Sequence, residues 1–104
     1  MFNTDRDGDA GGVSDITLDV ASVAANTSAE QTFTVPGLST DMVVFLNKSD
    51  LDAGLVVGNA RVSAADTLAV TFGNLTASPI DPASETYKLL WIKPNSTAIG
   101  AAKV

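Results

Sequence analysis

Carboxylates are the main side chains of this sequence that can do acid, base or metal chemistry. The 104 residues contain twelve Asp and Glu but neither His nor Cys. Histidine is the usual general base near neutral pH and the commonest metal ligand, and cysteine supplies thiolate nucleophiles and thiolate metal ligands. Serine–histidine triads, cysteine–histidine pairs and zinc sites built on these residues are therefore excluded.

Three aspartates alternate near the start of the chain, at Asp5, Asp7 and Asp9. Oxygen ligands at alternate positions are typical of calcium loops, but the turn glycine and the bidentate glutamate of an EF-hand are both missing at the required spacing. We therefore predict no metal and no other cofactor. Residues 1–13 are charged and rich in glycine, and we interpret them as a flexible N-terminal arm.

A hydrolase that uses two facing carboxylates is the enzyme class that this composition leaves open. The other acidic residues fall mostly in predicted turns or on outward strand positions, where carboxylates are common because they keep a surface soluble. No insertion interrupts the predicted strands to form a cleft. We therefore predict that the protein is not an enzyme.

Four Asn-x-Ser/Thr triplets, which begin at Asn26, Asn47, Asn74 and Asn95, match the pattern for N-glycosylation. The first residues lack the basic and apolar regions of a signal peptide, which argues against a secreted glycoprotein. Asn, Ser and Thr also concentrate in turns, because their side chains bond to nearby backbone. We interpret the triplets as turns, with glycosylation as the alternative.

The charge balance is acidic, with a formal net charge of −6. The six Lys and Arg do not cluster, whereas binding to nucleic acid requires a basic stripe. No apolar run reaches the roughly 18 to 20 residues of a membrane span. We therefore expect no nucleic-acid partner, no membrane contact and folding in the cytoplasm of the host cell.

Val and Thr recur in short runs that Gly, Pro, Asn, Asp and Ser interrupt, which is typical of strands joined by turns. Six strands and no helix longer than one turn are predicted, at residues 15–23, 31–35, 42–46, 54–63, 67–72 and 86–93. Gly58 and Asn59 indicate a bend or bulge in the fourth strand, and residues 63–66 form the turn of a hairpin. Residues 42–46 are apolar on both faces, which favours a central strand. Residues 86–93 also have two apolar faces, which indicates either a core strand or one that a neighbouring subunit covers.

These strands predict an all-β fold, a small β-sandwich with immunoglobulin-like Greek-key connections. A jelly roll and a small barrel are the alternatives. The sandwich domain is expected over residues 14–94, between the arm of residues 1–13 and a C-terminal tail of residues 95–104.

Two strings in the middle of the chain carry a family resemblance, NTSAEQTFTVPGL at residues 26–38 and NARVSAADTL at residues 59–68. Over residues 15–94 the chain resembles a small β-domain found among structural proteins of tailed bacteriophages. The positions that match the family pattern are Glu30, Gln31, Gly37, Asn59, Arg61 and Asp66. The resemblance implies that these residues are a signature of the fold and not an active site.

The resemblance further implies a decoration (cement) protein, a homotrimer that binds the outside of the assembled major capsid protein shell and stabilises it. Its location would be the capsid exterior of the virion, and a head-fibre, tail or receptor-binding (adhesin-like) module is the alternative. For contact with the shell we predict the arm, which lies outside the resemblance. Phe2 would be its apolar anchor and Asn3, Asp5, Arg6 and Asp7 its polar and charged contacts, becoming ordered when they bind.

Overall fold

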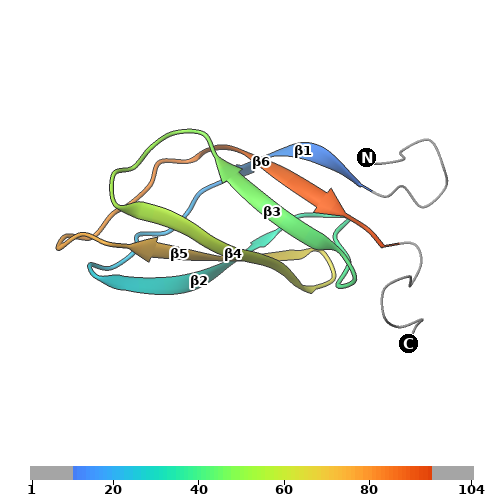
Figure 1. Cartoon of the computed structure of the whole chain (residues 1–104), viewed down its shortest axis with the longest axis horizontal. Helices are drawn as coiled ribbons and strands as arrows, with labels where there is room; N and C mark the ends of the chain where they lie inside the picture. Colours follow the sequence, from blue (N-terminus) through green and yellow to red (C-terminus); the bar gives the residue numbers. More distant parts are fainter. Residues whose placement is uncertain (1–10, 95–104) are drawn as a thin grey trace, which may run out of the picture.

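The structure, a computed structural model, describes residues 11–94 as six strands without a helix (Figure 1). The strands are β1 (Gly11–Leu18), β2 (Thr27–Thr34), β3 (Val43–Lys48), β4 (Leu55–Ala64), β5 (Thr67–Asn74) and β6 (Glu85–Ile92). Within this part of the chain no helix is present that is long and apolar enough to cross a membrane. The predicted all-β class is confirmed.

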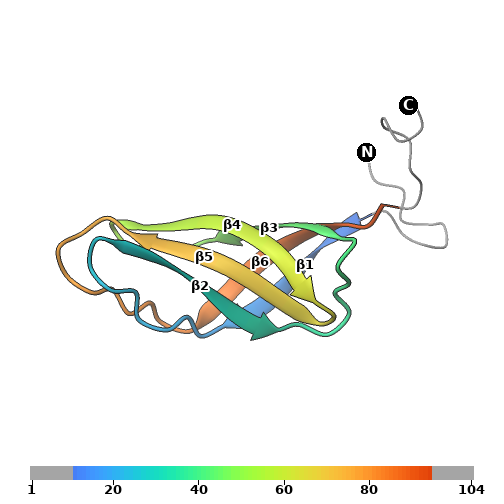
Figure 2. The ribbon, with the colours of Figure 1, turned by 90° about the horizontal axis from the view of Figure 1, so that it is seen from below.

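The six strands form two antiparallel sheets of three strands each, in the orders β1-β6-β3 and β2-β5-β4. The two sheets pack face to face, and β3 of one sheet contacts β4 of the other (Figures 1 and 2). This is the Greek-key order of an immunoglobulin sandwich, with β2-β5-β4 in the places of strands B, E and D and β3-β6 in those of C and F. β1 lies on the other side of β6, where an immunoglobulin domain has its last strand.

The core lies between the sheets and is supplied by alternate residues of the two central strands. Leu68, Val70 and Phe72 of β5 and Tyr87 and Leu89 of β6 are almost completely buried. Successive side chains of a strand point to opposite faces, so a period of two places all of these residues on the inner faces. Burying one such side chain stabilises the fold by roughly 1.5 to 3 kcal/mol.

The first strand begins earlier and ends earlier than the sequence predicts. Residues 11–13, expected in the arm, belong to β1, where Gly11 pairs with Ile92. A Cβ on Gly12 would lie 3.0 Å from the Trp91 ring, so glycine at the next position lets β1 pass close to that side chain. β1 ends at Leu18, so the prediction of a strand through residue 23 is wrong, although Val20 is still buried.

The prediction that residues 42–46 form a central strand is also wrong. β3 lies at the edge of its sheet, and β6 is the central strand. The second apolar face of β3, which includes Val43 and Phe45, is exposed in the described structure and not buried against a further element. β6 is the core strand that residues 86–93 predicted, with Tyr87 and Leu89 buried, whereas Leu90 and Ile92 lie half-buried on its outer face.

The predicted hairpin and bulge are confirmed. β4 and β5 pair in antiparallel register, and the register shifts between Val57 and Ala60, at the position of Gly58 and Asn59. The hairpin turn contains Asp66 at a φ of 59°, a left-handed conformation that aspartate tolerates better than most residues.

Asn74 is the one polar residue that is fully buried in the described core, and its amide makes four hydrogen bonds. Nδ2 donates to the carbonyl oxygens of Val23 and Ser78, at 3.0 and 2.8 Å. Oδ1 accepts hydrogen bonds from the backbone N and from Oγ1 of Thr76, both at 2.8 Å. This triplet therefore has the turn chemistry that the sequence indicated. Asn26 likewise occupies a turn, at a φ of 53°. Asn47 lies within β3, so the interpretation of its triplet as a turn is wrong.

We expect Asn74→Ala to destabilise the domain by about 2 to 4 kcal/mol, because it removes four hydrogen bonds at a buried position and leaves the backbone N–H of Thr76 without its partner. Urea denaturation followed by tryptophan fluorescence measures this change. Asn47→Ala, at an exposed position of β3, is the control and should cost less than about 0.5 kcal/mol. Equal stability of the two variants would contradict the structural role of Asn74.

Candidate functional site

Glu30 and Arg61 form an ion pair on the outer face of the β2-β5-β4 sheet. Arg61 donates from Nε to Oε2 of Glu30 over 2.8 Å and from Nη2 to Oε1 over 2.9 Å. The pair joins the two edge strands across β5, where Ala69, the register partner of Arg61, is fully buried. The hydrogen bond from Arg61 lowers the pKa of Glu30 below its ordinary value of 4.5. Both residues thus brace the sheet.

Gln31 and Asp66 hold neighbouring backbone segments through their side chains. The Gln31 amide accepts a hydrogen bond from the backbone N of Ala21 at 2.8 Å and donates one to its carbonyl at 3.0 Å. Oδ1 of Asp66 accepts a hydrogen bond from the N–H of Gly37 at 2.8 Å. Gly37 has a φ of 101°, a conformation that favours glycine. These residues connect loops to strands and have structural roles.

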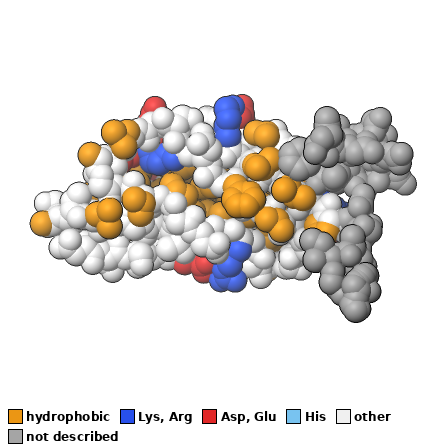
Figure 3. Space-filling model, viewed as in Figure 1, with side chains coloured by type: hydrophobic (Ala, Val, Ile, Leu, Met, Phe, Trp, Pro, Cys, Tyr) orange, Lys and Arg blue, Asp and Glu red, His pale blue; other side chains and the backbone are white. Residues whose placement is uncertain are grey.

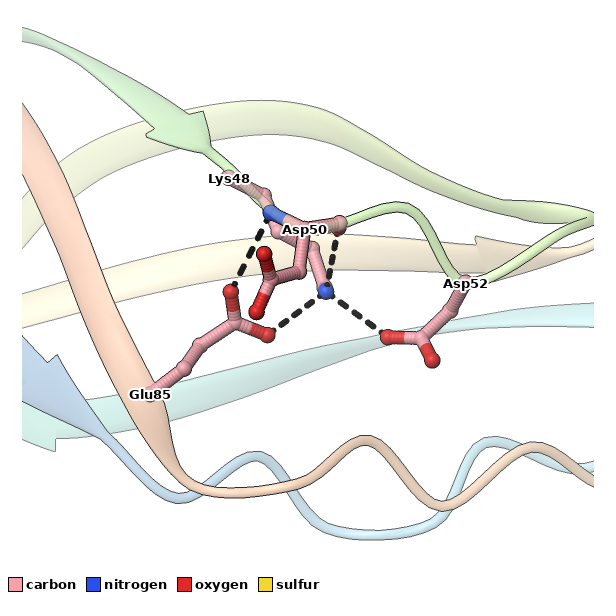
Figure 4. A network of polar contacts seen from close by, with 4 residues as sticks. All are labelled: Lys48, Asp50, Asp52 and Glu85. Carbon is pink, nitrogen blue, oxygen red and sulfur yellow. Dashed lines mark hydrogen bonds and ion pairs between the residues drawn. The ribbon is translucent and has the colours of Figure 1, made fainter.

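Lys48, Asp52 and Glu85 form a partly buried charged cluster (Figure 4). Nζ of Lys48 lies 2.7 Å from Oδ2 of Asp52 and 2.6 Å from Oε2 of Glu85, and it also donates to the backbone carbonyl of Asp50 at 2.7 Å. The side chains of Lys48 and Glu85 are only 7% and 12% exposed. The cluster therefore fixes the β3–β4 loop to the start of β6.

The pairing keeps Lys48 charged. Burial by itself would lower the pKa of Lys48, but the hydrogen bonds from Lys48 to Asp52 and Glu85 outweigh it and raise the pKa above its ordinary value. A lysine that acts as a base or nucleophile needs the opposite shift. The adjacent Tyr87 hydroxyl is buried without a hydrogen-bond partner, and its burial raises the pKa of Tyr87. The cluster is arranged for stability and not for proton transfer.

Metal ligands do not converge in the part of the chain that the structure describes. Between residues 11 and 94 no group of three or more His, Cys, Asp and Glu side chains is close enough to hold a metal ion. The aspartates at positions 5, 7 and 9 lie outside the described residues.

The outer face of the β1-β6-β3 sheet is the strongest candidate for a binding surface. The register places Val13, Leu90 and Phe45 in one row across the sheet and Ile92 beside Val43 in the next. Val13 is 62% exposed, Phe45 56% and Val43 49%. We call these five residues the apolar face. Figure 3 shows hydrophobic side chains gathered over the region of β3 and β6.

The apolar face is slightly concave and is bordered by a balanced pair of charges. A groove on it is lined by Val13, Phe45 and Leu90 together with Lys88. Nζ of Lys88 lies 2.7 Å from Oδ1 of Asp15. Asp15 therefore neutralises Lys88 in this groove, and recognition there would depend on apolar contact and shape.

The sequence indicated part of this surface but assigned binding elsewhere. Residues 42–46 and 86–93 are apolar on both faces, and this pattern indicated the surface. Where two paired strands both have apolar outward residues, these residues form one continuous face. The predicted contact residues Phe2, Asn3, Asp5, Arg6 and Asp7 lie outside the described residues. Where the described chain starts, Gly11 pairs with Ile92 and is therefore next to the apolar face.

The fold and this surface define the chain as a small immunoglobulin-like β-sandwich with an exposed apolar sheet face. Comparison with known protein families, with curated proteins and with solved structures finds no match to this chain.

Glu30→Gln should lower the melting temperature slightly at pH 7, because it removes a carboxylate whose pKa is lowered by Arg61 in the folded state. A carboxylate whose pKa is lowered by folding stabilises the folded state at pH values above its ordinary pKa. This contribution is lost as the pH falls through the pKa of the folded state. The melting curves of variant and wild type should therefore converge below pH 4.5, as scanning calorimetry at several pH values would reveal. Asp19→Asn, at an exposed position, is the control. A difference that does not shrink as the pH falls below 4.5 would contradict the assignment.

Proposed function

We propose that this chain is a virion structural protein, a decoration subunit that binds the outside of an assembled capsid shell and stabilises it. The observation that carries the proposal is the exposed apolar face of the β1-β6-β3 sheet. The resemblance at residues 15–94 supports the choice of a phage shell as its partner.

The size of the apolar face favours a weak, repeated contact. Exposed apolar patches of a few hundred Å² are often functional, whereas a stable pairwise interface buries about 800 Å² on each partner. The apolar face consists of five side chains on a three-stranded sheet. Its size is therefore that of a small functional patch and not that of a stable pairwise interface. A contact of this size binds usefully where many copies of the partner are held in a fixed array, as on a shell.

In this proposal the N-terminal arm adds contacts to those of the apolar face. β1 begins at Gly11, which shares a row with Ile92 and Val43 of the apolar face. A segment that precedes Gly11 therefore starts at the border of the face. In this arrangement Phe2 adds an apolar contact, and Asn3, Asp5, Arg6 and Asp7 add polar ones.

Stabilisation follows from mass action, without a chemical reaction. A subunit that binds the assembled shell and not the dissociated capsid protein adds its binding free energy to the stability of the shell. A homotrimer presents three apolar faces at once, and this linkage raises the avidity far above that of one face.

The double variant Val13→Ser with Phe45→Ser should weaken binding to undecorated capsids at least tenfold, because it removes two exposed apolar contacts of roughly 1 kcal/mol or more each. Co-sedimentation measures the binding, and the melting temperature of the capsid measures the stabilisation. Thr34→Ser, on the outer side of the other sheet, is the control. Wild-type protein that neither binds the capsids nor raises their melting temperature would refute the proposed function.

Deletion of residues 1–9 should weaken capsid binding, since it removes the contacts of Phe2, Asn3, Asp5, Arg6 and Asp7. The melting temperature of the free domain should stay nearly unchanged, because β1 and its pairing with β6 are intact. The same co-sedimentation assay, together with scanning calorimetry of the free protein, tests both statements. Unchanged capsid affinity would eliminate the arm as a contact.

A further inference from the structure

A second group of exposed apolar side chains lies at the opposite end of the sandwich, around the loops that follow β1, β3 and β5. Leu51 is 87% exposed, Leu75 72% and Val56 44%. We call this part of the molecule the loop end. Figure 3 shows hydrophobic side chains at the end of the molecule away from the grey residues. A groove beside Val56 and Leu75 passes over Gly73, which has no side chain to fill it.

The loops that carry the two leucines are fixed by several hydrogen bonds and an ion-pair cluster. Lys48 binds Asp52 and the backbone carbonyl of Asp50 on either side of Leu51 (Figure 4). The backbone N of Leu75 donates to the carbonyl of Gly54 at 2.9 Å, which joins the two loops. Fixed loops hold the leucines in water and prevent their collapse onto the core. Such preorganisation lowers the entropy lost on binding.

Charge at the loop end selects the partner. Five acidic residues lie in or next to its loops, namely Asp19, Asp50, Asp52, Asp81 and Glu85. The basic residue among them is Lys48, which is nearly buried and already paired with two of these carboxylates. Among residues 11–94, the carboxylates of Asp19, Asp50 and Asp81 make no ion pair. Two loop ends would repel each other, which disfavours a second copy of this chain.

We infer that the loop end is a second docking surface, and that its partner is a protein segment in which apolar side chains alternate with Lys or Arg. Leu51, Leu75 and Val56 contact the apolar side chains, and Asp50 and Asp81 attract the cations. The surface is separate from the apolar face, where Lys88 is paired with Asp15. One subunit is thereby able to hold two partners of different chemistry.

The test uses synthetic peptides and does not depend on the identity of the shell. A twelve-residue peptide of alternating Leu and Lys is compared by fluorescence anisotropy with two matched peptides, one with Glu in place of Lys and one with Ser in place of Leu. Wild type should bind the Leu–Lys peptide at least fivefold more tightly than either control peptide. Its affinity should fall as salt is raised, because salt screens exposed charges.

Two double variants locate the site. Leu51→Ser with Leu75→Ser should weaken binding of the Leu–Lys peptide at least tenfold, whereas Val13→Ser with Phe45→Ser should leave it unchanged. Asp50→Asn with Asp81→Asn should weaken it and flatten its salt dependence, while Asp41→Asn, at the other end of the domain, should do neither. Melting curves verify that each variant is folded. No binding by wild type, or binding that the loop-end variants do not change, overturns the inference, and neither result bears on capsid binding by the apolar face.

Discussion

The packing of β5 against β6 across the interior is the interaction on which the rest of this structure depends. Phe72 and Val70 on one strand and Tyr87 and Leu89 on the other are completely or almost completely buried. β5 and β6 are each the central strand of a three-stranded sheet, so the other four strands are all edge strands. With so few strands, each sheet has a narrow inner face, and a large share of the side chains faces outward. Apolar residues in excess of the core must therefore lie on an outer face, as Val13 and Phe45 do.

Alternation along the sequence was sufficient to predict most strands, because a period of two is a local property. It predicted the bulge at Gly58 and Asn59 and the hairpin that follows. Alternation did not predict the exposure of Val43 and Phe45. An apolar outer face gives the same sequence pattern whether another element covers it or water does. Which strand is central depends on pairing between distant segments, such as Phe45 with Leu90. The early end of β1 at Leu18 has a similar cause, because Val20 is buried in the core although it lies outside a strand.

The polar contacts of the candidate site were less predictable than the strands. Glu30 and Arg61 are 31 residues apart and Lys48 and Glu85 are 37 apart, so no local spacing signals either pair. Glu30 bonds to Arg61 across one sheet, and Asp66 bonds to the backbone of Gly37, so both carboxylates hold distant segments together. The carboxylates of Glu30, Asp52 and Glu85 brace strands and loops through their ion pairs with Arg61 and Lys48.

Rigidity connects the two proposed surfaces. The apolar face is formed by strands of one sheet, and the loop end is fixed by Lys48 and Asn74 to the same core. A subunit in which both surfaces move as one body holds two partners at a set distance, so binding at one surface raises the effective concentration of partner at the other. A flexible connection would lose most of this effect. Under these two proposals a small core is sufficient, because it only has to keep the apolar face and the loop end in a fixed relation.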